Sequence, residues 1–417
     1  MSQIALINHE DIYLYRDIPI KVGTTAFILP CHNEAADLPA ALETIKHQVG
    51  ARVDTILVVS DNSTDDTVAI ARAAGVSVIE TTGNCFKKAG ALNAGIRHLM
   101  ESGFLPEFII TGDGDTEYDS RFVVGSLTVM RAMPQLGVLS AVCLGKIGLV
   151  PFPRLTFPSH PKHADYQRFS VHSGFFRWLS FFAAIWQWAT AFLNYILVWM
   201  QQAEYARAVS LRLRQNIHTM SGAGSVLRTE AIVDVIRRGM PLGVSIDWQK
   251  VQVYREHEKN LVEDFALTLD VKRVGWKCTN NFYVIARTDL MRDFNSLLRQ
   301  RIRWVRGTID ELRRRKFSKE SRASAVTMVF GISLILPMYA INALFISMIF
   351  GENFNIVDFW ILPLMGAYQA IMLRKMGWRS MAIAFVLLPE MLFAVMRHVW
   401  IIISISNSFT STTQKWE

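Results

Sequence analysis

The feature that most constrains the fold is a regular alternation of short apolar runs with amphipathic stretches over residues 24–110. The apolar runs predict strands, and the stretches between them carry apolar residues at helical spacing, as at Leu38, Leu42 and Ile45. The predicted strands are 26–29, 55–59, 76–79 and 108–110, and the predicted helices are 36–48, 67–74 and 87–100. Strands that alternate with such helices form βαβ units with right-handed crossovers. We therefore expect an α/β fold with a mostly parallel central sheet.

Acidic residues follow two of these predicted strands. Asp61 comes just after the strand at 55–59, and Asp113 and Asp115 follow the strand at 108–110. Because the carboxyl ends of parallel strands meet at one edge of a sheet, these side chains should face one crevice. Gly114 permits a tight backbone path, so both flanking carboxylates can turn toward a divalent cation. An acidic turn that only caps the next helix is the alternative.

Several functional classes are not supported by the sequence. A dinucleotide-binding fingerprint should follow the first strand, but residues 30–34 contain no glycine, and the Gly-rich stretch 221–224 lies far downstream. A P-loop is absent, and the four cysteines form no C-x-x-C pair. The net charge of +8 is concentrated beside apolar segments, where an anionic lipid surface explains it better than nucleic acid. We therefore do not expect a nucleic-acid partner.

The second half of the chain carries two further candidate groups. Glu263 and Asp264 begin a predicted helix, where acidic residues either serve the helix dipole or carry chemistry. A later helix, 294–315, places Gln300, Arg303 and Trp304 on one face. An amide, a guanidinium and an indole side by side can bind a phosphate and stack on a sugar ring. An ordinary amphipathic helix with a basic surface is the alternative.

Apolar segments predict contact with a membrane. Residues 175–200 are long enough to span a bilayer, but their aromatic density favours a helix in the interface. A basic cluster at 313–322 precedes the apolar run 325–351, and two more apolar runs follow at 359–373 and 381–403. The last run either spans or bends at Pro389 and returns along the interface. The basic flanks predict about three C-terminal transmembrane helices with the preceding domain in the cytoplasm, and leave the side of the tail open.

Six short motifs fall in a fixed order along residues 24–310. They are Pro30–Glu34, Val58–Asp65, Lys88–Asn93, Asp113-Gly-Asp115, Glu263-Asp264 and Gln300-x-x-Arg-Trp304. Together with the apolar C-terminal runs they resemble the membrane-bound family 2 glycosyltransferases of the processive type. That group includes the cellulose, chitin, poly-N-acetylglucosamine and hyaluronan synthases. The resemblance implies a GT-A fold and an inverting transfer from a nucleotide-sugar, most often a UDP-sugar, to a growing β-linked poly- or oligosaccharide.

The resemblance also implies roles for individual residues. The nucleotide-sugar would be bound by the set Glu34, Asp61, Lys88, Asp113 and Arg303. Asp113 and Asp115 would hold Mg²⁺ or Mn²⁺ at the diphosphate. Asp264, beside Glu263, would be the general base on the acceptor hydroxyl. Gln300 and Trp304 would bind the acceptor sugar.

The expected layout follows from the motifs and the apolar runs. An N-terminal extension (1–23) precedes a cytoplasmic GT-A domain (24–318) with an interfacial aromatic insertion (151–215) and an interface helix (291–318). A transmembrane region (322–406) and a tail (407–417) complete the chain, which places the protein in the plasma or inner membrane. Where family members commonly have Thr-Glu-Asp, this chain has Val262, but both acids are kept.

Three predicted spans are few for a polymer channel within one chain. Either the product is short, or further subunits, such as copies in a homo-oligomer, complete the pore, or the acceptor is a membrane lipid. The alternative function is therefore a single addition of sugar to a lipid, because ceramide glucosyltransferases share much of this motif set. The expected partners are a nucleotide-sugar donor, a glycan or lipid acceptor and the bilayer.

Overall fold

The computed structural model describes residues 20–101, 105–146, 173–212, 217–238, 240, 246–256, 261–316, 318–333 and 356–410. The strands are β1 (Ile20–Cys31), β2 (Thr55–Asp61), β3 (Ser77–Thr81), β4 (Leu105–Gly112), β5 (Glu117–Tyr118), β6 (Leu136–Gly145), β7 (Gly224–Arg228) and β8 (Lys277–Thr288). The helices of the sheet-bearing body are α2 (Leu38–Lys46), α3 (Thr67–Ala73), α4 (Lys87–Glu101), α5 (Phe122–Ala132), α7 (Thr229–Arg237), a short η1 (Trp248–Lys250) and α8 (Glu263–Arg273). The remaining helices are α6 (Ser173–Arg212), α9 (Phe294–Arg314), α10 (Lys319–Ser333), α12 (Ile356–Met372), η2 (Arg374–Met376), α13 (Trp378–Phe385) and α14 (Leu388–Phe409).

The strands form one sheet in the order β3-β2-β1-β4-β7-β6-β8-β5. The first four strands pair in parallel, as the βαβ alternation predicts, and β6 also pairs in parallel with β8. β7 is antiparallel to both β4 and β6, and β5 is antiparallel to β8. The sheet is therefore mixed, and the expectation of a mostly parallel sheet holds only for part of it. The α/β fold class is confirmed.

Helices cover both faces of the sheet. Alternate residues of a strand point to opposite faces, so Ile28 packs in a cluster with α4, α7 and α8, while Phe27 and Leu29 pack with α2 and α5. These three side chains are completely buried, and burying one such side chain contributes about 1.5–3 kcal/mol to folding. The two clusters pack helices on both faces of the sheet and so hold the strands that lead to the acidic residues.

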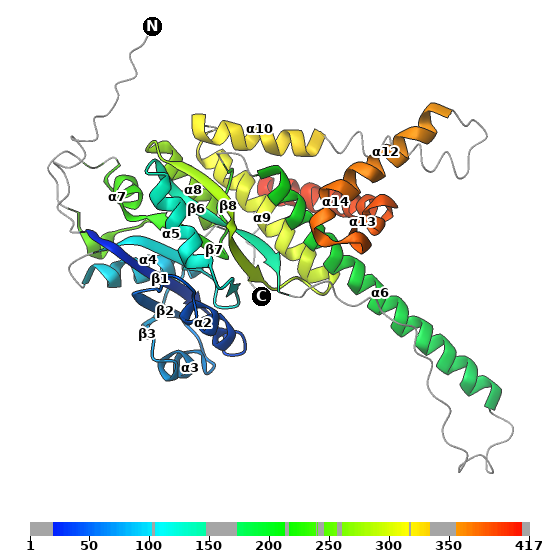
Figure 1. Cartoon of the computed structure of the whole chain (residues 1–417), viewed down its shortest axis with the longest axis horizontal. Helices are drawn as coiled ribbons and strands as arrows, with labels where there is room; N and C mark the ends of the chain where they lie inside the picture. Colours follow the sequence, from blue (N-terminus) through cyan, green and yellow to red (C-terminus); the bar gives the residue numbers. More distant parts are fainter. Residues whose placement is uncertain are drawn as a thin grey trace, which may run out of the picture.

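The long helices gather at one end of the molecule (Figure 1). A third core cluster joins α6, α9, α13 and α14, with Trp199, Leu297 and Phe393 among its buried members. α14 runs along α9, where Ser404 Oγ donates a hydrogen bond to the carbonyl of Ile302 at 3.2 Å. α6 continues away from the sheet-bearing body in Figure 1. The helix that carries the Gln-x-x-Arg-Trp motif is thus sandwiched between the body and α14.

The membrane predictions are only partly addressed by the described residues. One described helix, α14, is long and apolar enough to cross a bilayer, with 28% of its apolar window buried. The predicted span 325–351 falls largely outside the described residues, and three C-terminal spans are not confirmed. The apolar run 381–403 is broken at Leu387, which has a left-handed φ of 63°, just before Pro389 in the first turn of α14. The run is therefore interrupted beside Pro389, while the path of α14 across or along a bilayer stays a prediction.

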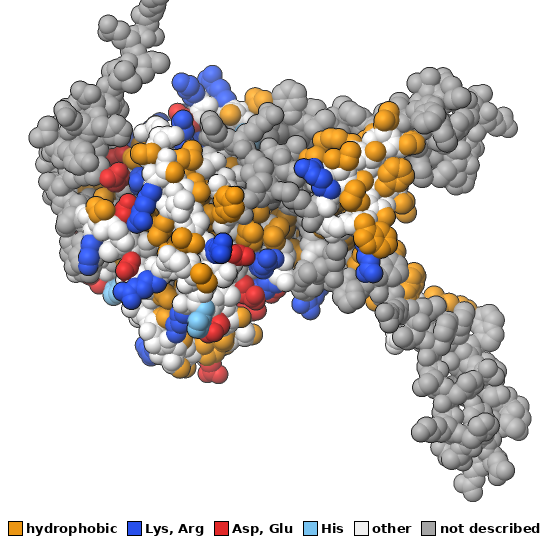
Figure 2. Space-filling view, viewed as in Figure 1, with side chains coloured by type: hydrophobic (Ala, Val, Ile, Leu, Met, Phe, Trp, Pro, Cys, Tyr) orange, Lys and Arg blue, Asp and Glu red, His pale blue; other side chains and the backbone are white. Residues whose placement is uncertain are grey.

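Apolar side chains are exposed on the C-terminal helices α12, α13 and α14 (Figure 2). The exposed set includes Leu364, Tyr368 and Ile371 on α12, Trp378 and Phe385 on α13, and Leu392, Val395, Val399 and Ile402 on α14. On α14 they recur at helical spacing, on the side away from the buried Phe393 and Trp400. α14 is thus apolar on both sides, one packed on protein and one open.

Candidate active site

The ends of several strands bring the predicted site residues to one edge of the sheet. β1 and β2 pair up to Cys31 and Ser60, so Glu34 and Asp61 follow neighbouring strands. Gly112 at the end of β4 pairs with Gly224 at the start of antiparallel β7. The loop that enters β7 therefore reaches the same edge as Asp113, which directly follows β4.

Lys88 lies at the centre of this edge. It stands in the first turn of α4, and its ammonium is bonded to a carboxylate oxygen of Asp113. It also donates to the carbonyl of Gly222 at 3.0 Å and lies 3.8 Å from Glu263 Oε1. Burial alone would lower the pKa of Lys88, but Asp113 and Glu263 outweigh it and hold the pKa above its ordinary value. Lys88 is therefore a fixed positive charge.

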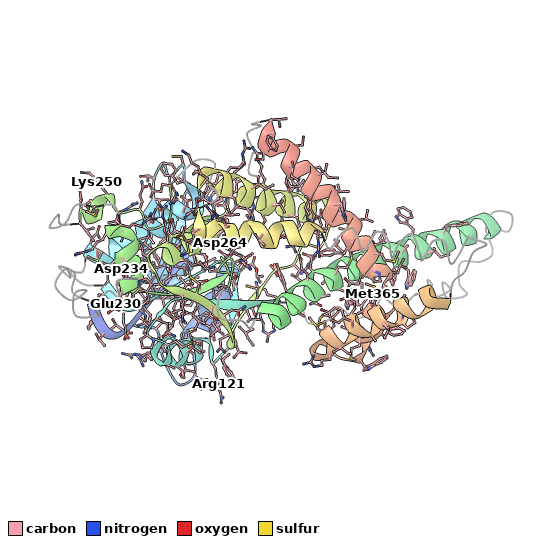
Figure 3. All side chains as sticks on the ribbon, turned by 90° about the horizontal axis from the view of Figure 1, so that it is seen from above. Arg121, Glu230, Asp234, Lys250, Asp264 and Met365 are labelled. Carbon is pink, nitrogen blue, oxygen red and sulfur yellow. The ribbon has the colours of Figure 1, made fainter. Side chains whose placement is uncertain are left out.

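Asp264 lies within electrostatic reach of Lys88. It stands in the first turn of α8, where one carboxylate oxygen accepts a hydrogen bond from the backbone N–H of Phe265 at 2.7 Å. Burial, and then the neighbouring Glu263, raise the pKa of Asp264 to about 7. Figure 3 shows Asp264 on the side of the sheet-bearing body that meets the long helices. A carboxylate whose pKa lies near neutrality can accept a proton at physiological pH.

Gly222 leaves the space between these two groups open. A Cβ on Gly222 would stand 3.1 Å from Lys88 Nζ and 3.6 Å from Asp264 Oδ2. Any side chain at this position would therefore enter the gap between the ammonium and the carboxylate. The sequence pattern around residues 221–224 gave no reason to place this glycine in the site, because only the antiparallel pairing of β7 brings it there.

Glu34 and Asp115 are two further carboxylates within electrostatic reach of Asp113. Burial and the neighbouring carboxylates raise the pKa of Glu34 to about 7 and that of Asp115 to about 6. Lys146 lowers both pKa values, but it also contacts Asp37 at 3.3 Å, so its charge is shared. Negative charge is thus in excess around these carboxylates, and a bound cation would reduce the repulsion between them.

The donor set fits Mg²⁺ or Mn²⁺. Within the described ranges, no three His, Cys, Asp or Glu side chains are arranged to hold a metal by themselves. Mg²⁺ is commonly bound by one or two carboxylates together with water and the phosphates of a substrate. Asp113 and Asp115, which flank Gly114, can provide such a pair, and the acid excess around them is consistent with a dication.

Asp61 is held in place by a hydrogen-bond network. Its Oδ1 accepts from Thr81 Oγ1 at 2.6 Å, from Asn84 Nδ2 at 2.8 Å and from Asn62 Nδ2 at 2.9 Å. The ring of His32 is 2.6 Å from its backbone carbonyl. Thr81 and Asn84 were not among the predicted site residues, because neither falls in a recognisable motif. They fix the orientation of a carboxylate that is 8% exposed.

α9 contributes Arg303 to the site. Burial lowers the pKa of Arg303, and Glu263, Asp113 and Asp264 oppose that effect, so the guanidinium lies within the electrostatic reach of all three carboxylates. The Oε1 atom of Gln300 is buried and has no hydrogen-bond partner among the described residues. It is thus an acceptor that a ligand could satisfy.

Trp304 is placed differently from Arg303. The guanidinium of Arg301 stacks over its ring at 4.6 Å, and Arg301 is paired with Glu204 of α6 at 2.6 Å. The structure therefore brings Arg303 to the carboxylates, while the contacts of Trp304 are with the residues that join α9 to α6. Its role at an acceptor sugar stays a prediction.

A family model described as "Glycosyl transferase family 2" matches residues 26–184, which is less than half of the chain. No curated protein matches the chain. The match covers the segment that carries Glu34, Asp61, Lys88, Asp113 and Asp115. It supports a glycosyltransferase of family 2, as the motifs predicted, and leaves the membrane-bound processive type unconfirmed.

Several solved structures are similar to this chain. The mannosyltransferase PcManGT from Pyrobaculum calidifontis, in complex with GDP-Man and Mn²⁺, is 15% identical with a TM-score of 0.51, over 97% of this chain and 94% of that one. S. aureus TarS 1–349 in complex with UDP is 12% identical with a TM-score of 0.39, over 94% of each chain. Glucosyl-3-phosphoglycerate synthase from Mycobacterium tuberculosis, in complex with Mn²⁺ and UDP, is 15% identical with a TM-score of 0.37, over 69% of this chain and 78% of that one. The likeness to PcManGT shows a fold of the GT-A type.

Proposed function

We propose that this chain is an inverting glycosyltransferase that moves a sugar from a nucleotide-sugar, of the UDP-sugar class, to a growing β-linked poly- or oligosaccharide at a membrane. One observation carries the proposal. Lys88 joins Asp113, the proposed metal ligand, to Gly222 and Glu263, next to Asp264, whose pKa is raised to about 7. A positive centre for a diphosphate and a separate base for a hydroxyl are the two elements this reaction needs.

The donor side stabilises the leaving diphosphate. Asp113 and Asp115 would hold Mg²⁺ or Mn²⁺, which when bound neutralises charge on the phosphate oxygens. Lys88 and Arg303 are the protein's own cations near the same position. Because both are half-buried, their attraction for a diphosphate is less screened than it would be in water. Asp61, oriented by its amide and hydroxyl donors, is assigned to the nucleoside at the neighbouring strand end.

The acceptor side activates the incoming hydroxyl. Asp264 accepts the proton as the oxygen attacks the anomeric carbon from the face opposite the diphosphate. Glu263 keeps the pKa of Asp264 high enough for it to act near neutral pH. The gap that Gly222 leaves beside Asp264 gives the hydroxyl room to approach. A single direct displacement of this kind inverts the anomeric configuration.

The arrangement of α9 supports an acceptor that arrives from a membrane. α9 carries Arg303 at the site and packs along α14, whose other side exposes apolar residues such as Leu392 and Val399. An apolar surface of this kind, next to a basic segment, suits a bilayer. We therefore place the enzyme at the plasma or inner membrane with its catalytic domain in the cytoplasm.

The same surface suits a lipid acceptor. An acceptor with an acyl chain could stay in the bilayer at α14 while its head group reaches the α9 side of the site. The second candidate is therefore a lipid glycosyltransferase that adds one sugar.

Product size distinguishes these two functions. The full-length chain in lipid vesicles is incubated with Mn²⁺ and, in turn, UDP-glucose, UDP-N-acetylglucosamine, UDP-glucuronate and GDP-mannose. Release of nucleoside diphosphate identifies the donor, and sizing the labelled product gives its length. We expect products longer than one added sugar. A product that never exceeds one sugar on lipid would establish the second function, and no nucleotide release from any donor would refute both.

A further inference from the structure

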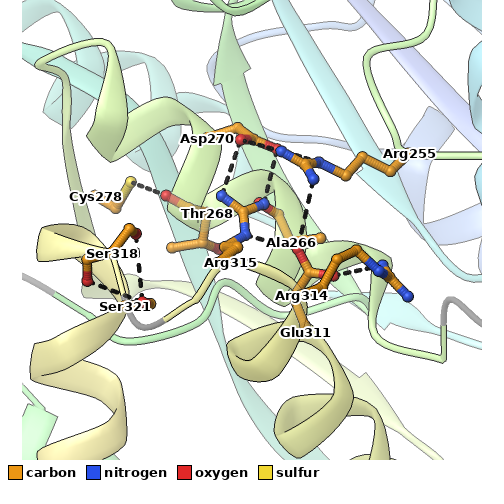
Figure 4. A network of polar contacts seen from close by, with 10 residues as sticks. All are labelled: Arg255, Ala266, Thr268, Asp270, Cys278, Glu311, Arg314, Arg315, Ser318 and Ser321. Atoms are coloured by element: carbon orange, nitrogen blue, oxygen red, sulfur yellow. Dashed lines mark hydrogen bonds and ion pairs between the residues drawn. The ribbon is translucent and has the colours of Figure 1, made fainter.

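A closed ring of charged side chains joins α8 and α9 (Figure 4). Its members are Arg255, Asp270, Arg315 and Glu311, which alternate in sign. Asp270 belongs to α8, Glu311 to α9, and Arg315 is the C-terminal cap of α9. The ring therefore links the helix that begins with Glu263 and Asp264 to the helix that carries Arg303.

Arg315 makes the main connection between the two helices. Its two terminal nitrogens each donate to one carboxylate oxygen of Asp270 at 2.9 Å, and its Nε donates to Glu311 at 2.6 Å. One of those nitrogens also donates to the backbone carbonyl of Ala266 at 2.8 Å. Ala266 is only two residues from Asp264. The guanidinium thus touches α8 next to the candidate base as well as at Asp270.

Three of the four side chains in the ring are buried, whereas Arg255 is 38% exposed. The side chains of Arg315, Glu311 and Asp270 are 2%, 1% and 8% exposed. Burial pushes the pKa of Asp270 upward, but its bonds from Arg315 and Arg255 outweigh this and hold the pKa below its ordinary value. Two acids balance two bases, so no buried charge is left uncompensated. Bidentate pairs in such surroundings have a fixed geometry.

Asn93 extends the network to α4, the helix of Lys88. Its Oδ1 accepts from the backbone N–H groups of Val253 and Tyr254 at 3.0 and 2.9 Å, and its Nδ2 donates to the carbonyl of Tyr254 at 2.6 Å. Arg255 comes next in the chain and donates to Asp270 at 2.9 Å through each of two nitrogens. Asn93 is completely buried. The helices of Lys88, Asp264 and Arg303 are thus joined through one set of polar contacts.

This network fixes helices that carry site residues, and none of its members is a proposed substrate contact. Asp270 lies about 9 Å along α8 from Asp264, and Arg315 lies about 18 Å along α9 from Arg303, at 1.5 Å per residue. A helix is stiff over such lengths, so fixing one end of each helix fixes the other. Loss of the pair would let the base and the guanidinium move relative to one another.

We propose that Asp270 and Arg315, held by Arg255 and Glu311, are positioning residues that set the separation of Asp264 from Arg303. The expected effect on rate rests on the proposed glycosyl transfer. The expected effect on the relative positions of α8 and α9 does not. A displacement of about 1 Å between reacting groups can reduce a rate by roughly 100-fold. The network would therefore control turnover without contacting the donor or the acceptor.

The test compares Asp270→Asn and Arg315→Lys with two control variants of the full-length chain. Arg314→Gln removes a partly exposed partner of Glu311 and leaves the pair of Asp270 and Arg315 intact. Arg228→Met removes a buried arginine that donates to the carbonyls of Met130 on α5 and Leu136 on β6, at the end of β7 away from Gly222, and so controls for loss of stability.

Three quantities are measured at a temperature where each variant is folded: kcat, the donor KM, and amide hydrogen exchange over residues 263–270 and 300–306. We expect Asp270→Asn and Arg315→Lys to lower kcat by roughly 10–100-fold with KM within about threefold, because neither substituted side chain is a proposed donor contact. Exchange should be faster in both segments. Neither control should show these changes.

Two results would overturn the proposal. One is a wild-type kcat with unchanged exchange in the folded variants. The other is an equal fall in kcat for Arg228→Met, which would show a general effect of lost stability. Should Asp270→Asn fail to fold, Arg255→Gln, which removes a partner that is 38% exposed, is measured in its place. If the wild type transfers no sugar, the proposed function fails, and the exchange data alone decide whether the ring orders the two helices.

Discussion

The pKa of Asp264 predicts a specific pH dependence for sugar transfer. The base must be deprotonated to act, and burial and Glu263 raise its pKa to about 7. Only about one molecule in ten then has the base form at pH 6, and about one in a hundred at pH 5. The rate of nucleotide release at low donor concentration should therefore fall about tenfold per pH unit below 7 and level off above it.

The neighbouring Glu263 allows the assignment to be tested. Glu263→Gln removes the charge that repels a negative Asp264, so the acid limb should move to lower pH. A shift of about one unit corresponds to about 1.4 kcal/mol of removed repulsion. Nucleotide release is measured from pH 5 to pH 9 at constant ionic strength, for the wild type and the variant, with the plateau rate as the internal reference.

A matched control separates Asp264 from the other acids. Glu34 also has a pKa raised to about 7, and Asp37 rather than Glu263 is among the main causes of that shift. Asp37→Asn should therefore leave the acid limb unchanged if Asp264 is responsible. An acid limb that moves with Asp37→Asn and stays in place with Glu263→Gln would refute the assignment of Asp264 as the base.

Three further predictions concern the metal, the charged ring and the membrane surface. Chelation should abolish nucleotide release and added Mn²⁺ should restore it, whereas Asp115→Asn should require a higher Mn²⁺ concentration for half-maximal activity; activity that resists chelation would contradict a metal-bound diphosphate. Asp270→Asn should lower the free energy of unfolding by about 3–5 kcal/mol at pH 7 in denaturant titrations. The difference between wild type and variant should shrink below about pH 4, because a carboxylate whose folded pKa is depressed loses its stabilising effect as pH falls through that pKa. A difference that is the same at pH 3 as at pH 7 would contradict the ion-pair account. The double substitution Leu392→Glu with Val399→Glu on α14 should reduce flotation with anionic vesicles. Val49→Glu, at an exposed apolar position after α2, should not. Equal flotation of the wild type and both variants would exclude α14 as the docking surface.

The sequence predicted the parts of the fold that depend on local pattern. Apolar runs and helical spacing located β2, β4, α2 and α4 to within a few residues. The rule that parallel strand ends share one edge also placed Asp61 and Asp113 together. The start of α8 at Glu263 was likewise predicted from its acidic first turn.

Long-range pairings were not predictable in the same way. β7 inserts between β4 and β6 in antiparallel orientation, and this choice brings Gly222 to Lys88. No local sequence pattern indicates that pairing, because a short apolar run is compatible with either a parallel or an antiparallel strand. Arg315 was interpreted as part of a basic cluster beside the membrane, but its side chain is 2% exposed and bonded to Asp270. Charges 45 residues apart in sequence give no sign that they pair in a protein interior.

The most direct test of the central claim measures nucleotide binding and sugar transfer on the same samples of wild type and Asp264→Asn. Calorimetry with the nucleoside diphosphate and Mn²⁺ reports the donor side, and release of nucleotide from the matching nucleotide-sugar reports the chemistry. We predict a similar Kd for the two proteins and a transfer rate lower by about 100- to 10,000-fold in Asp264→Asn, because only the base has been removed. Transfer by Asp264→Asn at the wild-type rate, or no transfer by the wild type from any nucleotide-sugar, would contradict the account.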